Sequence, residues 1–377
     1  MLLLLSLVLV LSCADGVSVS CKNEKNEDVD WFILYKEPNG LKYIYQDESG
    51  LREPAGDVTD VLVNTLSPML KSARNMDASF GFLSYNDQPP GCSSTTSGHS
   101  KGENDNQRRT TIRLNNQGQT KSKKYLVPEK LGRVELSKSG YVCTHECVPV
   151  GLVMGDSQSK EALWMVHSTP QFPYRRDQNH FWPDSGKVRA QTFMCVSLNY
   201  DDLETVGLHL QNIKALVYDY DLPAGFPKGL DDSVQKTTTD TRDTTRQGTM
   251  FPLSTRKAKQ LSILAKKNDR TAAAGDLYVQ LSIALQSDMA AQTYGGQHGR
   301  DKSFCTGTFQ VLNVKKLLSW DPNQDHSKWA VTTTDWTCIG DSNRAPTQYE
   351  RPGGALCIND QDVTYAFMGI MQEVEEC

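Results

Sequence analysis

His326-Ser327-Lys328, within the run Gln324-Asp325-His326-Ser327-Lys328-Trp329-Ala330-Val331, repeats the tripeptide His99-Ser100-Lys101 from earlier in the chain. The chain has only 7 histidines, so two copies of His-x-Lys predict one active site assembled from two related halves. Imidazole can attack phosphorus or transfer a proton near its usual pKa of about 6.5, and a lysine can hold a phosphate oxygen. In extended backbone, residues i and i+2 point the same way, so both groups can face one phosphate.

The overall composition is that of a globular protein. The 377 residues are 38% hydrophobic, which is enough for one large domain or two smaller ones. The net charge of −5 does not favour binding to DNA or RNA at neutral pH. Protonation of all 7 histidines would give −5 + 7 = +2, so acidic conditions favour a polyanionic ligand. The alternative is that the mild acidity serves only solubility.

The first residues predict a signal peptide. The apolar run from Met1 to Leu11 is too short to span a bilayer, and Ser12-Cys13-Ala14 offers small residues for cleavage, which places the signal at 1–14. No later stretch reaches the roughly 18 apolar residues of a membrane helix. We therefore expect no membrane association for the mature chain, and a location in the secretory pathway, in a lysosome or outside the cell.

The cysteines favour an oxidising compartment. Ten cysteines lie at long spacings without a Cys-x-x-Cys zinc pattern, so disulfides are expected. Removal of Cys13 with the signal leaves an odd number. The chain contains no Asn-x-Ser/Thr sequon, so sorting that depends on an N-glycan is disfavoured and secretion is favoured.

Hydrophobic patterning divides the chain into two halves, 15–222 and 223–377. Period-2 and apolar runs predict strands at 29–36, 42–45, 79–85, 151–154, 162–167, 190–198, 215–220, 261–264 and 326–331. Residues 309–318 form a further apolar segment, and 336–344 predict a strand and turn. Helical periodicity is found at 58–73, around His209, at 276–285 and at 363–371. Residues 231–249 are rich in Thr, Asp and Gln and predict an exposed loop.

A polar, basic stretch at 103–150 interrupts the first half and is predicted to be an insertion. It lacks helical or strand periodicity, which is typical of a solvated loop, although its lysines and arginines could also contact phosphates. Cys143 and Cys147 flank His145, and in a secreted chain a disulfide is favoured over a metal site there.

The first tripeptide also allows a different nucleophile. Gly98-His99-Ser100-Lys101-Gly102 matches the Gly-x-Ser-x-Gly elbow of serine hydrolases. That elbow needs a strand before it and a helix after it, and the flanking residues are typical of neither. Ser100 is therefore the weaker hypothesis.

The motifs together resemble the deoxyribonuclease II family of the phospholipase D superfamily. The resemblance extends over nearly the whole mature chain and rests on six segments: Val29-Asp30-Trp31-Phe32, Tyr85-Asn86-Asp87-Gln88-Pro89-Pro90, Gly98-His99-Ser100-Lys101-Gly102, Trp164-Met165-Val166-His167-Ser168, Asp325-His326-Ser327-Lys328-Trp329 and Trp336-Thr337-Cys338-Ile339-Gly340-Asp341. It implies an α/β (mixed α+β), phospholipase D-like fold of two pseudo-symmetric halves, each with a mixed sheet flanked by helices. It also implies endonuclease cleavage of DNA at acid pH without metal or cofactor, leaving 3′-phosphate ends.

The same resemblance implies the site residues. His99, Lys101, His326 and Lys328 would be catalytic, with Asn343, which lies 17 residues after His326, and His167 adding hydrogen bonds. His167 lies 68 residues after His99, so the insertion separates parts that the family keeps close. The implied disulfides are Cys21–Cys195, Cys305–Cys377 and Cys338–Cys357, which leaves Cys92, Cys143 and Cys147 unmatched.

The resulting hypothesis is a phosphohistidine mechanism in which one motif histidine attacks and the other protonates the leaving 5′-oxygen. His326 is favoured as nucleophile because no insertion interrupts its half. The main rival is a secreted, catalytically impaired relative that binds nucleic acid or a host partner through its altered first half. A phospholipase shares the two tripeptides but not their context. A homodimer is a further possibility.

Overall fold

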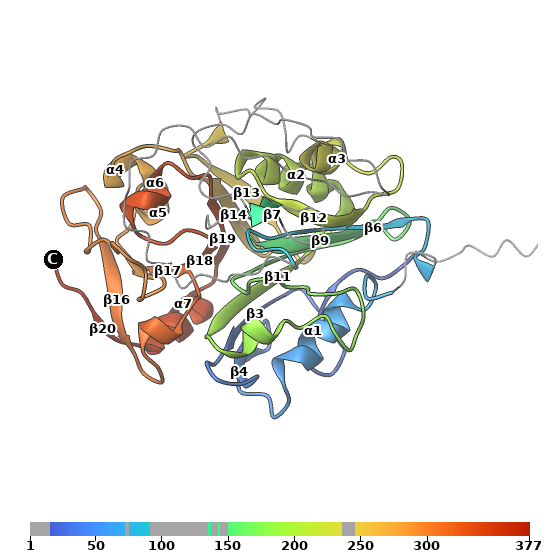
Figure 1. The fold of residues 1–377 in the computed structure, drawn as a ribbon, viewed down its shortest axis with the longest axis horizontal. Helices are drawn as coiled ribbons and strands as arrows, with labels where there is room; N and C mark the ends of the chain where they lie inside the picture. The colour runs from blue at the N-terminus through green and yellow to red at the C-terminus, as the bar shows by residue number, and fades with distance from the viewer. Residues whose placement is uncertain (1–15, 72–74, 91–134, 137–141, 144–149, 236–245) are drawn as a thin grey trace, which may run out of the picture.

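The computed structural model describes residues 16–71, 75–90, 135–136, 142–143, 150–235 and 246–377. The predicted signal peptide, His99, Lys101, Cys92, Cys147 and most of the predicted insertion lie outside these residues. Two eight-stranded sheets dominate the molecule, with helices on their faces (Figure 1). The α/β class expected from the sequence is therefore confirmed.

The first sheet has the order β12-β6-β9-β10-β11-β3-β4-β5. Its strands are β3 (Trp31–Lys36), β4 (Tyr43–Asp47), β5 (Gly50–Arg52), β6 (Phe80–Tyr85), β9 (Gly151–Asp156), β10 (Glu161–His167), β11 (Gln191–Asn199) and β12 (Val217–Asp221). The accompanying elements are β1 (Cys21–Lys22), β2 (Asp28–Val29), α1 (Val58–Leu66), β7 (Glu135–Leu136), β8 (Val142–Cys143), η2 (Asp184–Lys187), η3 (Tyr200–Asp202), α2 (Leu203–Asn212) and α3 (Lys228–Gln235).

The second sheet has the order β13-β14-β19-β18-β17-β15-β16-β20. Its strands are β13 (Met250–Ser254), β14 (Gln260–Ala265), β15 (Met289–Gln292), β16 (Val311–Leu317), β17 (Trp329–Thr332), β18 (Trp336–Gly340), β19 (Gly354–Asn359) and β20 (Met371–Val374). The accompanying elements are α4 (Ala272–Gly275), α5 (Leu277–Leu285), η5 (Pro322–Gln324), α6 (Pro346–Tyr349) and α7 (Gln361–Gly369).

Five consecutive strands have the same arrangement in both sheets. In the first sheet these strands are, in order, β6, β9, β10, β11 and β3. The equivalent strands of the second sheet, in the same order, are β15, β17, β18, β19 and β14. The helices agree as well, since α1 and α5 each precede the first of these strands, and α2 and α7 each follow the fourth. The two halves therefore share one topology, and residues in one half have structural equivalents in the other.

The helices α2 and α7 lie between the two sheets, in a core shared by both halves. That core joins Leu203 and Leu210 of α2 to Leu261 and Ile263 of the second sheet, and includes Phe367 of α7. Helix α1 covers the outer face of the first sheet, and α5 covers the outer face of the second. Figure 1 shows α1 and α2 on opposite faces of the first sheet. The halves are thus packed through buried apolar side chains, which is the main favourable term in folding.

Local sequence explains several of these elements. Helix α1 begins with a capping box, in which Asp57 and Asp60 each accept a hydrogen bond from the other's backbone. It ends at Leu66 rather than at residue 73 as predicted, because Pro68 cannot donate a helical hydrogen bond. Asn39 adopts a left-handed φ of 57° in the turn before β4, a conformation that asparagine tolerates better than most residues.

Three details differ from the sequence prediction. Residues 231–235 belong to α3, because apolar Leu230 and Val234 pack against the shared core. The sequence resemblance implied a mixed sheet in each half, but all described strand pairs of the first sheet are antiparallel. Only the second sheet is mixed among the described pairs, because β15 pairs with β16 in parallel. In the second sheet, β13, β15, β19 and β20 have no counterpart among the predicted strands. All strands of the first sheet precede residue 222 and all strands of the second follow it, whereas the exact boundary stays a prediction.

The structure contains the three disulfides that the resemblance implies: Cys21–Cys195, Cys305–Cys377 and Cys338–Cys357. Cys195 and Cys357 occupy equivalent places on β11 and β19, but their partners differ in each half. In the part of the chain that is described, no helix is both long and apolar enough to cross a membrane.

Candidate active site

The second His-x-Lys lies in extended backbone between η5 and β17, directly before the strand rather than within it. Asp325, Ser327 and Trp329 are buried, whereas His326 and Lys328 are partly exposed. This alternation places the imidazole and the ammonium group on the same side of the backbone. This burial pattern agrees with the expectation that both side chains face one direction in this half.

A buried hydrogen-bond network holds the opposite side of this segment. The hydroxyl of Tyr35 on β3 donates a short hydrogen bond to the Asp325 carboxylate and contacts Ser327 Oγ at 2.7 Å. Asp325 also accepts from Trp320 Nε1 at 3.0 Å and from the Ser327 backbone N–H at 2.8 Å. Trp329 Nε1 donates to the Tyr35 hydroxyl at 3.0 Å. Because its members are satisfied by one another, this network fixes the backbone on both sides of His326.

The two halves are also joined through the backbone at this point. The N–H of Ala190, just before β11, donates to Gln324 O at 2.8 Å, and the N–H of His326 donates to Ala190 O at 3.0 Å. These bonds form a parallel bridge between Ala190 and Asp325. The first half therefore positions the motif of the second half directly.

The His326 imidazole is surrounded by one aromatic ring and two cations. Its ring meets the Tyr294 ring edge-on, with centroids 4.7 Å apart. Lys328 Nζ donates to the His326 backbone oxygen at 3.2 Å, and the Arg189 guanidinium lies 5.2 Å from the Tyr294 centroid. Desolvation, and then the positive charges of Lys328 and Arg189, lower the pKa of His326 to about 3. The imidazole is therefore neutral at pH 5 and retains the lone pair that nucleophilic attack requires.

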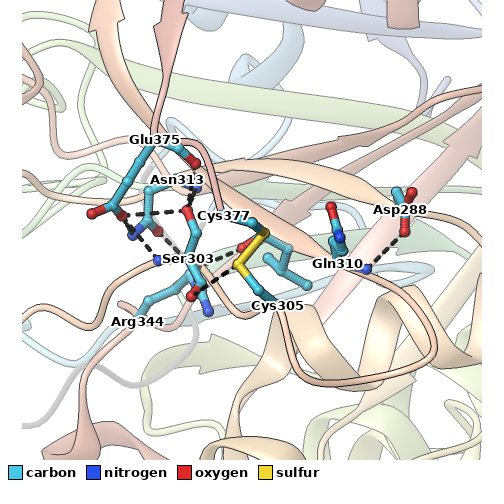
Figure 2. Close-up of a disulfide and its surroundings, with 9 residues drawn as sticks. Asp288, Ser303, Cys305, Gln310, Asn313, Arg344, Glu375 and Cys377 are labelled. Atoms are coloured by element: carbon cyan, nitrogen blue, oxygen red, sulfur yellow. Dashed lines mark hydrogen bonds between the residues drawn. A yellow bond between two sulfur atoms is a disulfide. The ribbon is translucent and has the colours of Figure 1, made fainter.

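Asn343 lies beside this cluster and is fixed from both sides. Its Oδ1 accepts from the Tyr294 backbone N–H at 3.3 Å, and its Nδ2 donates to Gln297 Oε1 at 3.0 Å. The next residue, Arg344, is buried and pairs with Asp276 at 2.9 Å. Figure 2 shows Arg344 next to Asn313 and the Cys305–Cys377 disulfide. The side chain of Asn343 is thus held by Tyr294 and Gln297, and its backbone neighbour Arg344 is fixed by the buried pair with Asp276.

His167 ends β10 in the first half and is almost fully buried. Its ring packs against Phe172 and Phe193 at centroid distances of 5.0 and 5.2 Å. The Thr169 backbone N–H donates to Nδ1 at 3.2 Å, so the proton of the neutral ring is on Nε2. Nε2 has no hydrogen-bond partner among the described residues. Burial lowers the pKa of His167 to about 3, so this side chain is a neutral donor rather than an acid.

A small cavity separates the ends of β10 and β18. His167 and His209 line it from the first half, and Gly340 and Asp341 line it from the second. Asp341 accepts from Ser342 Oγ at 2.7 Å and from the Gly354 backbone N–H at 2.6 Å. Burial raises the pKa of Asp341 to about 6, although Lys266 and Lys328 oppose that rise. Asp341 therefore changes charge at mildly acidic pH close to Lys328.

The first half differs at the position equivalent to Lys328. The Gly340 N–H donates to Lys328 O at 2.8 Å, and in the first half the His167 N–H donates to Val150 O at 3.2 Å. Gly340 and His167 are equivalent, so Val150 occupies the place of Lys328. The first His-x-Lys is separated from β9 by 49 residues, 102–150, and His99 and Lys101 lie outside the described residues.

The structure thus brings His326, Lys328 and Asn343 together and places His167 across the cavity from Asp341. Sequence reasoning missed Tyr35, Asp325, Arg189, Tyr294 and Asp341. Asp325 and Asp341 lie within the sequence segments that carry the family resemblance. Their carboxylates within those segments were the sequence signal that could have identified them as site residues. The other three come from distant segments, and nothing in their local sequence marks them. No described group of three His, Cys, Asp or Glu side chains is arranged to hold a metal ion.

The comparisons with known proteins agree with the motifs. A family model described as Deoxyribonuclease II matches residues 20–111 and 147–377. Plancitoxin-1 of Acanthaster planci is 28% identical, covering 100% of this chain and 97% of that protein. Deoxyribonuclease-2-alpha of Rattus norvegicus is 27% identical, covering 96% and 95%. A phosphatidylserine synthase structure from Haemophilus influenzae gives a TM-score of 0.29 at 12% identity over 59% of this chain and 60% of its own, which is too low to support any argument.

Proposed function

Because the chain belongs to the deoxyribonuclease II family of hydrolytic nucleases, we propose that it is a metal-independent acid endodeoxyribonuclease that leaves 3′-phosphate ends. The predicted signal peptide and the three disulfides support a secreted or lysosomal location. DNA is the substrate in this proposal, and a homodimer stays a prediction.

One observation carries the proposal: the neutral His326 imidazole lies close to two cations, Lys328 and Arg189, that make no ion pair with any described carboxylate. Among the described residues, no carboxylate lies within ion-pair distance of Arg189 or Lys328, whereas Arg52, Arg256 and Arg344 are all paired. Uncompensated positive charge around a nucleophile favours an anionic substrate such as a phosphodiester.

In the proposed reaction, His326 attacks phosphorus and displaces the 5′-oxygen of the next nucleotide. His99 supplies the proton to that oxygen, and the DNA 3′-oxygen stays bonded to the phosphoryl group on His326. Water then attacks the phosphohistidine, with His99 accepting its proton, and releases a 3′-phosphate end and neutral His326. Lys101 and Lys328 hold the non-bridging oxygens throughout.

The depressed pKa of His326 supports its role as nucleophile, because this imidazole stays unprotonated under acidic conditions. Asn343 and the Nε2–H of His167 would donate hydrogen bonds to phosphate oxygens. Asp341 supplies a physical reason for an acid optimum. Below a pH of about 6 it loses its negative charge, and the positive potential near Lys328 then increases.

The test is a plasmid-nicking assay at about pH 5 in excess chelator, a pH at which an unperturbed histidine is protonated. The proposal expects cleavage by the parent chain and loss of cleavage in His326→Ala. His180→Ala is the matched control, because His180 is exposed and bonds only Asp177 among the described residues. Undiminished cleavage by His326→Ala, or cleavage that requires a divalent cation, would contradict the proposal.

The second candidate is a nucleic-acid or host-partner binder with impaired catalysis. The observation that favours it is Val150 at the place of Lys328, with the first His-x-Lys separated from β9. Binding of DNA by the parent chain without nicking at any acidic pH would support this candidate over the nuclease.

A further inference from the structure

Arg189 is a residue of the first half that lies in the half-site of the second. It immediately precedes Ala190, whose backbone forms the parallel bridge to Asp325. Its guanidinium extends over the Tyr294 ring, and the same ring meets His326 edge-on at 4.7 Å. Arg189 and His326 therefore contact one aromatic side chain.

The backbone that carries Arg189 is held on several sides. Lys36 is buried in β3, and its Nζ donates to Gly40 O at 3.1 Å and to Lys187 O at 3.2 Å. The N–H groups of Asn39 and Gly40 donate to Val188 O and Lys187 O. A side chain attached to such a fixed segment loses little further backbone freedom on binding, which is the condition for a preorganised contact.

The guanidinium has one partner among the described residues besides the ring, a neutral one. Nη1 donates a short hydrogen bond to the Asn323 backbone oxygen, and no described carboxylate pairs with Arg189. By contrast, the buried Arg344 is neutralised by Asp276 at 2.9 Å. An arginine presents five N–H donors, so with respect to the described residues Arg189 has further donors and an unpaired charge to offer beside His326.

We propose that Arg189 binds a phosphodiester oxygen of DNA at the His326 half-site, with Tyr294 holding the guanidinium and the imidazole in a fixed relation. This inference rests on the proposed function. It makes the second half-site a composite, with a phosphate-binding arginine supplied by the first half.

The experiment compares Arg189→Gln, Arg189→Lys and the parent chain by steady-state cleavage of a DNA duplex across a range of salt concentrations. A charged hydrogen bond contributes about 1.5–3 kcal/mol, so Arg189→Gln should raise KM by roughly 10- to 100-fold and leave kcat within about twofold. The slope of log KM against log salt concentration should fall by about 1, because one fewer phosphate contact releases fewer counterions. Arg189→Lys should restore most of the salt slope but only part of KM.

Arg270→Gln is the matched control, since it removes the same charge from a side chain that is 82% exposed and paired with Glu350. Equal shifts of KM and salt slope in both variants, or no shift in Arg189→Gln, would overturn the inference. DNA binding by anisotropy in a His326→Ala background gives the same comparison without turnover. If the parent chain binds DNA but does not cleave it, the proposed function fails, and the affinity difference still decides the role of Arg189.

Discussion

The two halves share one topology but differ in how the His-x-Lys tripeptide is joined in sequence to its strand. In the second half, His326 and Lys328 directly precede β17 and are held by a buried network that reaches Tyr35 on the other sheet. In the first half, Val150 precedes β9 where a lysine would be equivalent. The same fold thus carries one preorganised half-site and one whose tripeptide is 49 residues away from its strand. This difference is the reason why we propose that the nucleophile belongs to the second half.

The most severe test of this difference is Lys328→Met. Removing one group that stabilises the transition-state charge costs about 10²- to 10³-fold in kcat, and we expect that loss here. Lys316→Met, on the exposed part of β16, is the control and should leave kcat unchanged. A loss in Lys328→Met confined to KM would mean that this lysine contributes to ground-state binding only.

Deletion of residues 102–150 should make the two halves alike. It joins Lys101 to Gly151 and gives Lys101 the place that Val150 now occupies before β9. Loop length has a weak effect on stability, so the shortened chain should fold, and we expect kcat to rise by roughly 10- to 100-fold. A deletion of 103–140 is the control, because it leaves Val150 in place and should produce no such increase. Lower activity after the larger deletion would show that the insertion contributes to the site.

Tyr35→Phe tests whether the network between the halves positions His326. It removes the hydroxyl that donates to Asp325 and accepts from Trp329 Nε1, leaving buried polar groups unsatisfied. We expect the free energy of unfolding to fall by about 1–3 kcal/mol and kcat to fall about tenfold. Chemical denaturation and steady-state kinetics measure the two effects. Tyr220→Phe, at a 55% exposed position, should alter neither; a loss of stability without any loss of kcat would limit Tyr35 to a structural role.

Asp341→Asn has the smallest expected effect and tests the acid dependence. The pKa of Asp341 is raised to about 6, so its carboxylate is neutral below that pH and negative above it. In the parent chain the negative charge opposes phosphate binding as pH rises. The variant should therefore gain about fivefold in kcat/KM at pH 7, a factor that corresponds to about 1 kcal/mol of screened repulsion, and be unchanged at pH 5. Asp362→Asn, exposed on α7, is the control. A pH profile identical to the parent in both variants would show that Asp341 does not contribute to the acid dependence.

Much of the fold could be predicted from the sequence, because its main strands and helices have strong local patterns. The hairpin of β3 with β4, that of β9 with β10, and helix α5 all lie where periodicity predicted them. The strands β13 and β20 lie at the two edges of the second sheet. Both are short; β13 contains Pro252, which is atypical of a strand, and β20 has polar residues at its centre. Helix α3 was missed because its polar residues resemble a loop.

The candidate site could be predicted only where the functional residues lie close together in sequence. His326 and Lys328 precede the hairpin of β17 and β18, and Asn343 follows it, so spacing and motif were informative. Tyr35 and Arg189 reach the same site through the contact between halves, which is a tertiary property. The equivalence of Val150 and Lys328 follows only from the hydrogen-bond register, which relates β9 to β17.

Trapping the covalent intermediate tests most directly whether His326 is the nucleophile. A 3′-phosphoryl DNA fragment should be recovered on the peptide that contains His326 after rapid alkaline quenching of a reaction at about pH 5, an environment in which the phosphoramidate bond is preserved for mass spectrometry. His326→Ala should abolish the adduct, while His180→Ala should not. An adduct on any other residue, or cleavage by the parent chain that leaves no adduct and depends on a divalent cation, would contradict the account.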